Sequence, residues 1–267
     1  MALTSWNAVS IVELVIYTHA LFISIYLWAR HGFGRNVAWI YLMAFTIIRV
    51  VGASLQLATI GSQDSIDLQT AVARLSYIGL SPLLLTTFCL LKRVNESIEK
   101  SYNTGLTPLR FKLIRIPIII ALILVIVGVS ASAADLIETG FYTIQVTTKV
   151  GVALFILVFA TIVLITGVFI LHYAYVEVGQ RRLLIAVAVS LPFIFVRLIY
   201  TILVTFTSLK GFSIIDGNVV AAGCTAVMEE MIVVMIYEAV GLTLPQEKRI
   251  RTERKWWRWR NRKTTEI

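Results

Sequence analysis

The chain alternates long apolar stretches with short polar segments. An α-helix needs about 20 predominantly apolar residues to cross the hydrocarbon core of a bilayer. Seven stretches reach that length, at approximately residues 10–29, 37–60, 68–91, 113–134, 150–175, 183–207 and 219–244. The pattern predicts an all-α integral membrane protein. It would be a seven-transmembrane-helix bundle over residues 1–245, followed by a basic tail over residues 246–267.

Basic residues gather in every second connector. The base-rich segments are 30–35, 92–115, 181–182 and the tail, whereas 61–67, 135–149 and 209–218 hold few basic residues. Lys and Arg are enriched in the cytoplasmic loops of membrane proteins. The alternation therefore predicts an N-terminus that is lumenal or outside and a C-terminus that is cytosolic.

Composition supports a membrane protein and argues against a nucleic-acid partner. Only 15% of the residues are charged and 58% are hydrophobic, whereas a soluble domain is usually about 25% charged. The net charge of +9 comes mostly from the connectors and the tail, where topology and attraction to a membrane surface account for it. No folded basic domain is present, so the expected partner is the lipid bilayer. The oligomeric state stays open.

Several charged residues interrupt the apolar stretches. The seventh stretch holds Glu229, Glu230 and Glu238, and an acidic side chain at bilayer depth costs roughly 2.5 kcal/mol or more. Three other stretches each hold a deep arginine, and the first holds a glutamate; these residues are Arg49, Arg74, Arg197 and Glu13. We expect the bundle to bring these groups together in one buried polar chamber.

Helical periodicity sorts the polar residues further. Glu229 and Glu230 differ by about 100° around their helix, so one can pair with an arginine while the other points into the chamber. Most of the buried charge falls in the central and lumenal half of the bundle. The residues expected to bind substrate or organise the charges are Arg49, Gln56, Arg74, Tyr77, Arg197 and Tyr200.

A purely structural role is the alternative for each of these groups. The arginines could form salt bridges or bind carbonyl groups between helices, and Glu238 is expected to bridge to a cytosolic base such as Arg181 or Arg35. For Glu13 and the Glu229–Glu230 pair, a catalytic role is about as well supported as a structural one. A carboxylic acid in a site without water has a raised pKa, which makes it a usable acid near neutral pH, whereas an adjacent arginine acts in the opposite direction.

The sequence offers little for other chemistries. It has no HExxH motif, no CxxC motif and no cluster of histidines, so neither a metal site nor a cofactor is expected. Buried carboxylates and aromatic side chains facing an apolar interior suit the acid-triggered opening of an epoxide on a lipophilic substrate. One neutral acid would donate a proton, and one carboxylate would accept a proton from water or from an internal hydroxyl group.

Five segments carry a resemblance to a known family. They are ELVIY (13–17), RHGFGR (30–35), RVVGASLQLA (49–58), IGLSPLLL (78–85) and PFIFVRLIY (192–200). These segments resemble a fungal seven-transmembrane family that includes or is close to the membrane-bound terpene cyclase of ascofuranone biosynthesis and to polyene epoxide hydrolases. The resemblance implies an acid–base cyclase or epoxide hydrolase of secondary metabolism. Its pattern carries over onto Glu13, Arg49, Gln56, Arg74, Arg197, Tyr200 and the pair Glu229–Glu230.

The leading hypothesis is therefore a cofactor-independent enzyme of the endoplasmic reticulum membrane that opens an epoxide on a terpenoid or polyketide small molecule. Glu230 or Glu229 would donate the proton, and Glu13 would act as the base or hold water. The arginines would fix the orientation and ionisation of the carboxylates. The alternatives are a seven-transmembrane receptor or lipid sensor, and a lipid translocator, both without catalysis.

Overall fold

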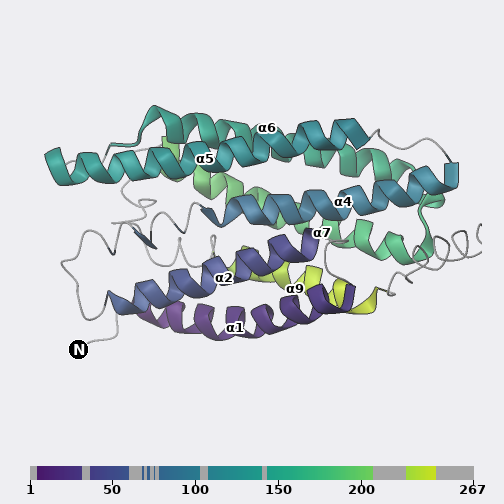
Figure 1. Cartoon of the computed structure of the whole chain (residues 1–267), viewed down its shortest axis with the longest axis horizontal. Helices are drawn as coiled ribbons and strands as arrows, with labels where there is room; N and C mark the ends of the chain where they lie inside the picture. Colours follow the sequence, from purple (N-terminus) through teal and green to yellow (C-terminus); the bar gives the residue numbers. More distant parts are fainter. Residues whose placement is uncertain are drawn as a thin grey trace, which may run out of the picture.

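The computed structural model describes residues 5–31, 37–59, 68, 71–72, 75, 78–102, 108–139, 143–206 and 227–244. Within these ranges the regular structure is entirely helical (Figure 1). The α-helices are α1 (Ser5–His31), α2 (Val37–Ala58), α4 (Leu80–Tyr102), α5 (Pro108–Thr139), α6 (Val146–Leu171), α7 (Val178–Phe206) and α9 (Met228–Thr243). A short 3-10 helix, η1 (Tyr173–Tyr175), follows α6.

Five of these helices are long and apolar enough to cross a membrane. The segments are Val9–His31, Val37–Ala58, Leu113–Ser132, Val146–Leu171 and Gly179–Phe206. This finding confirms the predicted helical class and is what a membrane protein requires. α4 and α9 are not among the five, because the second half of α4 carries charged residues and the described α9 has 16 residues, a length of about 24 Å.

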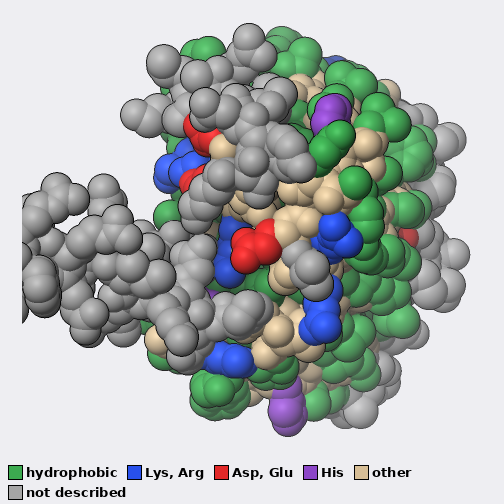
Figure 2. Space-filling model, turned by 90° about the vertical axis from the view of Figure 1, so that its right-hand side faces the viewer, with side chains coloured by type: hydrophobic (Ala, Val, Ile, Leu, Met, Phe, Trp, Pro, Cys, Tyr) green, Lys and Arg blue, Asp and Glu red, His purple; other side chains and the backbone are tan. Residues whose placement is uncertain are grey.

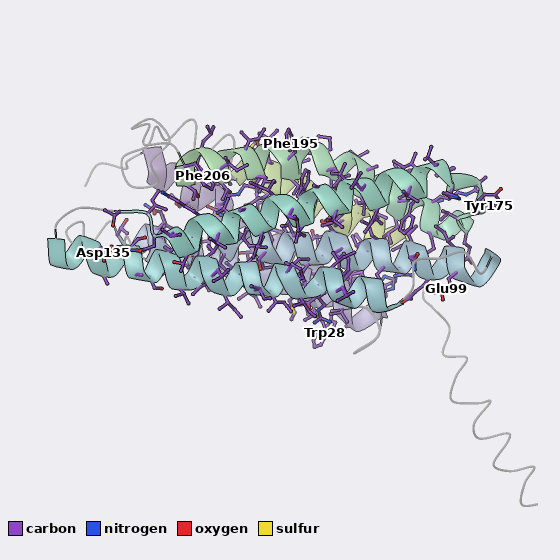
Figure 3. All side chains as sticks on the ribbon, turned by 90° about the horizontal axis from the view of Figure 1, so that it is seen from above. Trp28, Glu99, Asp135, Tyr175, Phe195 and Phe206 are labelled. Carbon is purple, nitrogen blue, oxygen red and sulfur yellow. The ribbon has the colours of Figure 1, made fainter. Side chains whose placement is uncertain are left out.

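The helices lie side by side with alternating direction, so the bundle has two ends (Figure 1). Asp135 and Phe206 lie at one end, while Glu99 and Tyr175 lie at the other (Figure 3). We call the second one the basic end. It is formed by the last turns of α1, α4, α6 and α9 and the first turns of α2, α5 and α7, and lysine and arginine side chains are visible on it (Figure 2).

Helix α4 occupies the middle of the bundle. Neighbouring helices are in contact in the order α1, α2, α4, α5, α6, α7, α9, and α9 returns to α1. α4 also contacts α6 and α7, and every residue from Leu80 to Phe88 is buried. A helix segment that is apolar on all sides is typically one that other helices surround.

The predicted boundaries of α1, α2, α5, α6 and α7 differ from the observed ones by up to five residues, and that of α4 by more at its end. The stretch predicted at 68–91 continues as α4 to Tyr102, because Leu90, Leu91, Val94 and Ile98 keep a buried helical stripe while Lys92 and Glu96 face outward. The stretch predicted at 150–175 is helical over 146–171, and the η1 turn takes up its last residues. Average hydropathy shows where a run of apolar residues lies, whereas the helix extends as far as buried residues recur at helical spacing.

Candidate functional site

Four charged side chains from four helices form one connected ionic cluster. Arg49 of α2 donates from Nη1 to Glu13 Oε1 of α1 at 3.2 Å, and from Nη2 to Glu230 Oε2 of α9. Arg197 of α7 donates from Nε to the other oxygen of the same glutamate, Oε1. The cluster therefore runs Glu13–Arg49–Glu230–Arg197 and ties α1, α2, α7 and α9 together.

The ionic cluster is almost completely enclosed. Exposed fractions of the side chains are 10% for Glu13, 8% for Arg49, 4% for Arg197 and 0% for Glu230. The cluster holds two cations and two anions, so its net charge is zero. Burial of charged groups is tolerated only when they are paired and hydrogen-bonded, and this arrangement meets that requirement.

Aromatic rings and a glycine hold the two guanidinium groups in place. The Arg49 guanidinium carbon lies 5.7 Å from the centroid of the Phe45 ring, one helical turn earlier on α2. The guanidinium also packs against Gly79, where a Cβ atom would lie 3.5 Å from Arg49 Nε. The Arg197 guanidinium carbon lies 5.5 Å from the ring centroid of Tyr200. These cation–π contacts suit guanidinium groups that are enclosed in the interior, and the Gly79 contact is of ordinary van der Waals length.

The two neighbouring glutamates of α9 have different surroundings. Glu230 accepts hydrogen bonds from two arginines, whereas Glu229 forms no ion pair with a described residue, and its buried Oε2 has no hydrogen-bond partner. The prediction that one of the pair binds an arginine is confirmed, and that residue is Glu230. Arg197 is close enough to interact electrostatically with Glu229 as well, but Oε2 of Glu229 forms no hydrogen bond with a described residue. That the second glutamate points into a chamber stays a prediction.

The remaining predicted site residues do not all lie in contact with the ionic cluster. Tyr200 lies against Arg197, as its spacing suggested. Gln56 lies two turns beyond Arg49, about 10 Å along the α2 axis, and its side chain forms no hydrogen bond with any residue that the structure describes. Arg74 and Tyr77 lie outside the described residues.

Tyr17 belongs to the surroundings of the cluster, and sequence reasoning missed it. Its side chain is fully buried, its ring packs edge-on against Phe45 with 5.8 Å between centroids, and its hydroxyl has no hydrogen-bond partner. Arg49, Glu13 and Arg197 are all close enough to interact electrostatically with that hydroxyl. The available signal was its position four residues after Glu13, which places both residues on one face of α1.

A second group of polar contacts lies further along α9, toward the basic end. Glu238 accepts a hydrogen bond from Ser24 of α1 at 2.9 Å, and the Tyr237 hydroxyl lies 2.8 Å from Thr87 Oγ1 of α4. The expected bridge from Glu238 to Arg181 is wrong, since Glu238 forms no ion pair with a described residue; Arg35, the other expected partner, lies outside the described residues. The Arg181 guanidinium instead donates to the carbonyl groups of Val176 and Ala174 at 2.9 and 3.0 Å, because it closes the turn between α6 and α7.

Among the residues that the structure describes, no group of three or more His, Cys, Asp or Glu side chains is arranged to hold a metal ion. The ionic cluster offers two carboxylates, Glu13 and Glu230, and both are bound by arginine. What the arrangement supplies chemically is a fixed, water-poor set of charges with an unpaired acid next to it.

The fold and the cluster define an all-helical protein of the membrane-spanning type with a buried arginine–glutamate network. The chain belongs to the family described as Domain of unknown function (DUF7702), whose model matches residues 3–248. That range contains all four residues of the ionic cluster. Comparison with curated proteins gives no match, and comparison with solved structures gives none either.

Proposed function

We propose that this chain is a membrane-bound enzyme that opens an epoxide on a lipophilic terpenoid or polyketide substrate, by hydrolysis or by capture with an internal hydroxyl group. The observation that carries the proposal is the contrast within the pair on α9. Glu230 is bound by two arginines, while the Glu229 carboxyl group has a buried oxygen without a partner. An acid catalyst needs a carboxyl group of the second kind.

Each carboxyl group takes one role in this mechanism. Glu229, in its neutral form, donates its proton to the epoxide oxygen as one C–O bond breaks. The oxygen of water, or of a hydroxyl group on the substrate, attacks the carbon atom and gives its proton to Glu13. Only one oxygen of Glu13 accepts a hydrogen bond from Arg49, so the other can accept this proton. Return of the proton from Glu13 to Glu229 completes the cycle.

The arginines organise the site in this proposal. Arg49 and Arg197 hold Glu230 as the central anion, and Arg49 also orients Glu13. Glu230 thus acts as an anchor for the cluster and leaves acid catalysis to Glu229. Candidate substrate contacts are Gln56, Arg74, Tyr77 and Tyr200.

The proposal includes seven membrane spans in the endoplasmic reticulum, with a lumenal N-terminus and a cytosolic C-terminus. Two further spans would come from the segments that contain α4 and α9. The described basic residues support this orientation, because Arg30, Arg181 and Arg182 lie near the ends of α1 and α7 that form the basic end, and Lys92, Arg93 and Arg115 lie in the halves of α4 and α5 nearer to it. Lysine and arginine are enriched on the cytosolic side of membrane proteins.

Glutamine substitutions at the three glutamates test the proposed function. Microsomes with equal amounts of folded protein are supplied with a panel of epoxidised terpenoids and polyenes, and the ring-opened products are measured. We expect Glu229→Gln and Glu13→Gln each to reduce turnover by about 100-fold or more, the usual contribution of general acid–base catalysis. Glu99→Gln, at an exposed position on α4 near the basic end, is the matched control and should retain full activity.

Undiminished turnover by all three variants, Glu13→Gln, Glu229→Gln and Glu230→Gln, would end the proposal. Absence of conversion by the wild-type protein across the panel would favour a receptor or translocator instead.

A further inference from the structure

An arginine at the basic end lies on a tyrosine from a different helix. The guanidinium carbon of Arg115, on α5, lies 5.7 Å from the ring centroid of Tyr41, on α2, and Nη2 donates a hydrogen bond to the tyrosine hydroxyl. Arg115 is exposed and stands near the start of the apolar segment Leu113–Ser132. The hydrogen bond holds the guanidinium group beside the Tyr41 hydroxyl, near the start of the apolar segment of α5.

Arg115 has no acidic partner among the residues that the structure describes. A guanidinium group carries five N–H donors, and within the described part of the chain Arg115 uses them for a single hydrogen bond, to the neutral Tyr41 hydroxyl. The arginines of the ionic cluster are different, because each of them binds a carboxylate. The donor capacity of Arg115 is therefore available to an anion from outside the chain.

A second cation lies close by on α4. Lys92 and Arg115 both interact electrostatically with the Cys89 thiol, which stands three residues before Lys92, and Cys89 in turn interacts with Tyr41. Lys92 is exposed, and its contact with Glu96 is a solvent-facing pair of 3.7 Å, an interaction that contributes little. Tyr41 and Arg115 are in direct contact, and α4, which carries Lys92, packs against both α2 and α5. These three helices therefore contribute Tyr41, Lys92 and Arg115 to the same side of the bundle.

The surface that continues from Arg115 is apolar. Ile119 and Ile123, four and eight residues after Arg115 on the same side of α5, are exposed, and in a membrane-spanning segment such residues contact acyl chains. A positive group at the end of an apolar exposed face matches the two parts of an anionic phospholipid. Basic sites between helices near the cytosolic surface bind such headgroups.

We propose that Arg115, Lys92 and Tyr41 form a binding site for the phosphate of one anionic phospholipid, with its acyl chains along the exposed face of α5. The planar guanidinium group binds two phosphate oxygens at once, and the lysine adds a second positive charge. This site is separate from the ionic cluster and does not depend on the proposed enzymatic activity.

Lipid retention tests the site. The full-length protein is placed in nanodiscs of phosphatidylcholine with a minor fraction of phosphatidylserine, and native mass spectrometry counts the lipids that remain bound after release. We expect the wild-type protein to retain phosphatidylserine in preference to phosphatidylcholine. Arg115→Gln should reduce this preference to about one fifth, the effect of losing one basic contact with an anionic lipid.

Arg182→Gln is the matched control, because Arg182 is an exposed arginine of α7 near the basic end and the substitution removes the same charge. It should leave the preference nearly unchanged. Arg115→Lys keeps the charge without the planar donor group, so an intermediate preference is expected; this variant also serves if Arg115→Gln folds poorly.

Three results would overturn the inference. The wild-type protein could show no preference for phosphatidylserine. Arg115→Gln and Arg182→Gln could lower the preference equally, which would mean that only surface charge matters. Inorganic phosphate, added to protein in pure phosphatidylcholine nanodiscs, could raise the unfolding temperature as much as phosphatidylserine does, which would indicate a site for free phosphate.

Discussion

At the scale of single residues, Glu230 is the charged side chain on which the ionic cluster depends. Its two oxygens accept from different arginines, and the side chain is completely buried. Removing its charge would leave Arg49 and Arg197 with Glu13 as the one remaining described carboxylate in ion-pair contact. A buried ion pair that loses one partner is strongly destabilising, because the other charge stays buried without compensation.

We therefore predict that Glu230→Gln lowers the free energy of unfolding by about 3 kcal/mol or more. Glu229→Gln is the control, since it changes a neighbouring glutamate that forms no ion pair with a described residue. Its effect should stay below about 1 kcal/mol. Thermal or denaturant unfolding of the purified protein in detergent measures both values, and similar losses in the two variants would contradict the geometry of the cluster.

At the scale of helices, close approach between α5 and α6 depends on small residues. A Cβ atom at Gly151 of α6 would collide with the Val125 side chain and lie 3.0 Å from the Ala121 carbonyl oxygen, on α5. Gly128 of α5 similarly packs against the start of α6, at Thr147 and Thr148. Small residues at helix interfaces in membranes allow this close backbone packing, on which association of the helices depends.

We predict that Gly151→Ala destabilises the protein by about 1–3 kcal/mol, the usual cost of overpacking a well-packed interface. Gly167→Ala, on the same helix, is the control because nothing lies within 4 Å of a Cβ atom at that position. The control should leave stability unchanged or slightly higher, since alanine is the better helix former. Unfolding temperatures in detergent provide the measurement, and an equal response of the two variants would rule out tight packing at Gly151.

At the scale of the whole molecule, charge is distributed unequally between the two ends. Toward the basic end the described helices carry nine lysines and arginines, whereas the described residues near the opposite end include Asp135 and Lys149. The nine are Arg30, Lys92, Arg93, Lys100, Arg110, Lys112, Arg115, Arg181 and Arg182. Alternation of helix direction brings the last turns of α1, α4 and α6 and the first turns of α2, α5 and α7 to the same end (Figure 1). A bundle with this asymmetry has one preferred orientation in a membrane.

We predict that a glycan acceptor site appended to the N-terminus is modified in microsomes, while the same site appended to the C-terminus is not. The physical reason is retention of the base-rich connectors on the cytosolic side. A mobility shift that glycosidase treatment reverses provides the measurement. Modification of the C-terminal site alone would invert the orientation, and modification of both sites or of neither would contradict an odd number of spans.

Several features of the fold follow from the sequence alone. The apolar stretches locate α1, α2, α5, α6 and α7 to within a few residues at most ends, because helix formation in an apolar segment depends on local composition. The spacing of Arg197 and Tyr200 also predicted their contact. The partly charged continuation of α4 to Tyr102 was missed, since mean hydropathy does not register a helix whose buried face includes polar residues such as Arg93, Asn95 and Ser97.

The sequence predicted most of the residues that belong to the candidate site, but not which of these residues bind one another. A buried charge in an apolar stretch is costly wherever it lies, so Glu13, Arg49, Arg197 and Glu230 could be selected without a structure. Gln56 shares a face with Arg49 yet forms no described contact with the cluster, because two helical turns separate their depths by about 10 Å. Tyr17 was not predicted as a site residue, because an uncharged side chain in an apolar stretch does not need an ionic partner. It nevertheless lies beside the cluster.

The sequence by itself determined the helices, their apolar character, the asymmetry of basic connectors and the small set of charges that need partners. These properties follow from composition and spacing along one dimension. Only the tertiary structure decided that α4 lies in the middle, that Glu230 instead of Glu229 binds the arginines, and that Glu238 hydrogen-bonds to Ser24. Those outcomes depend on the rotation of each helix about its own axis and on which helix becomes its neighbour.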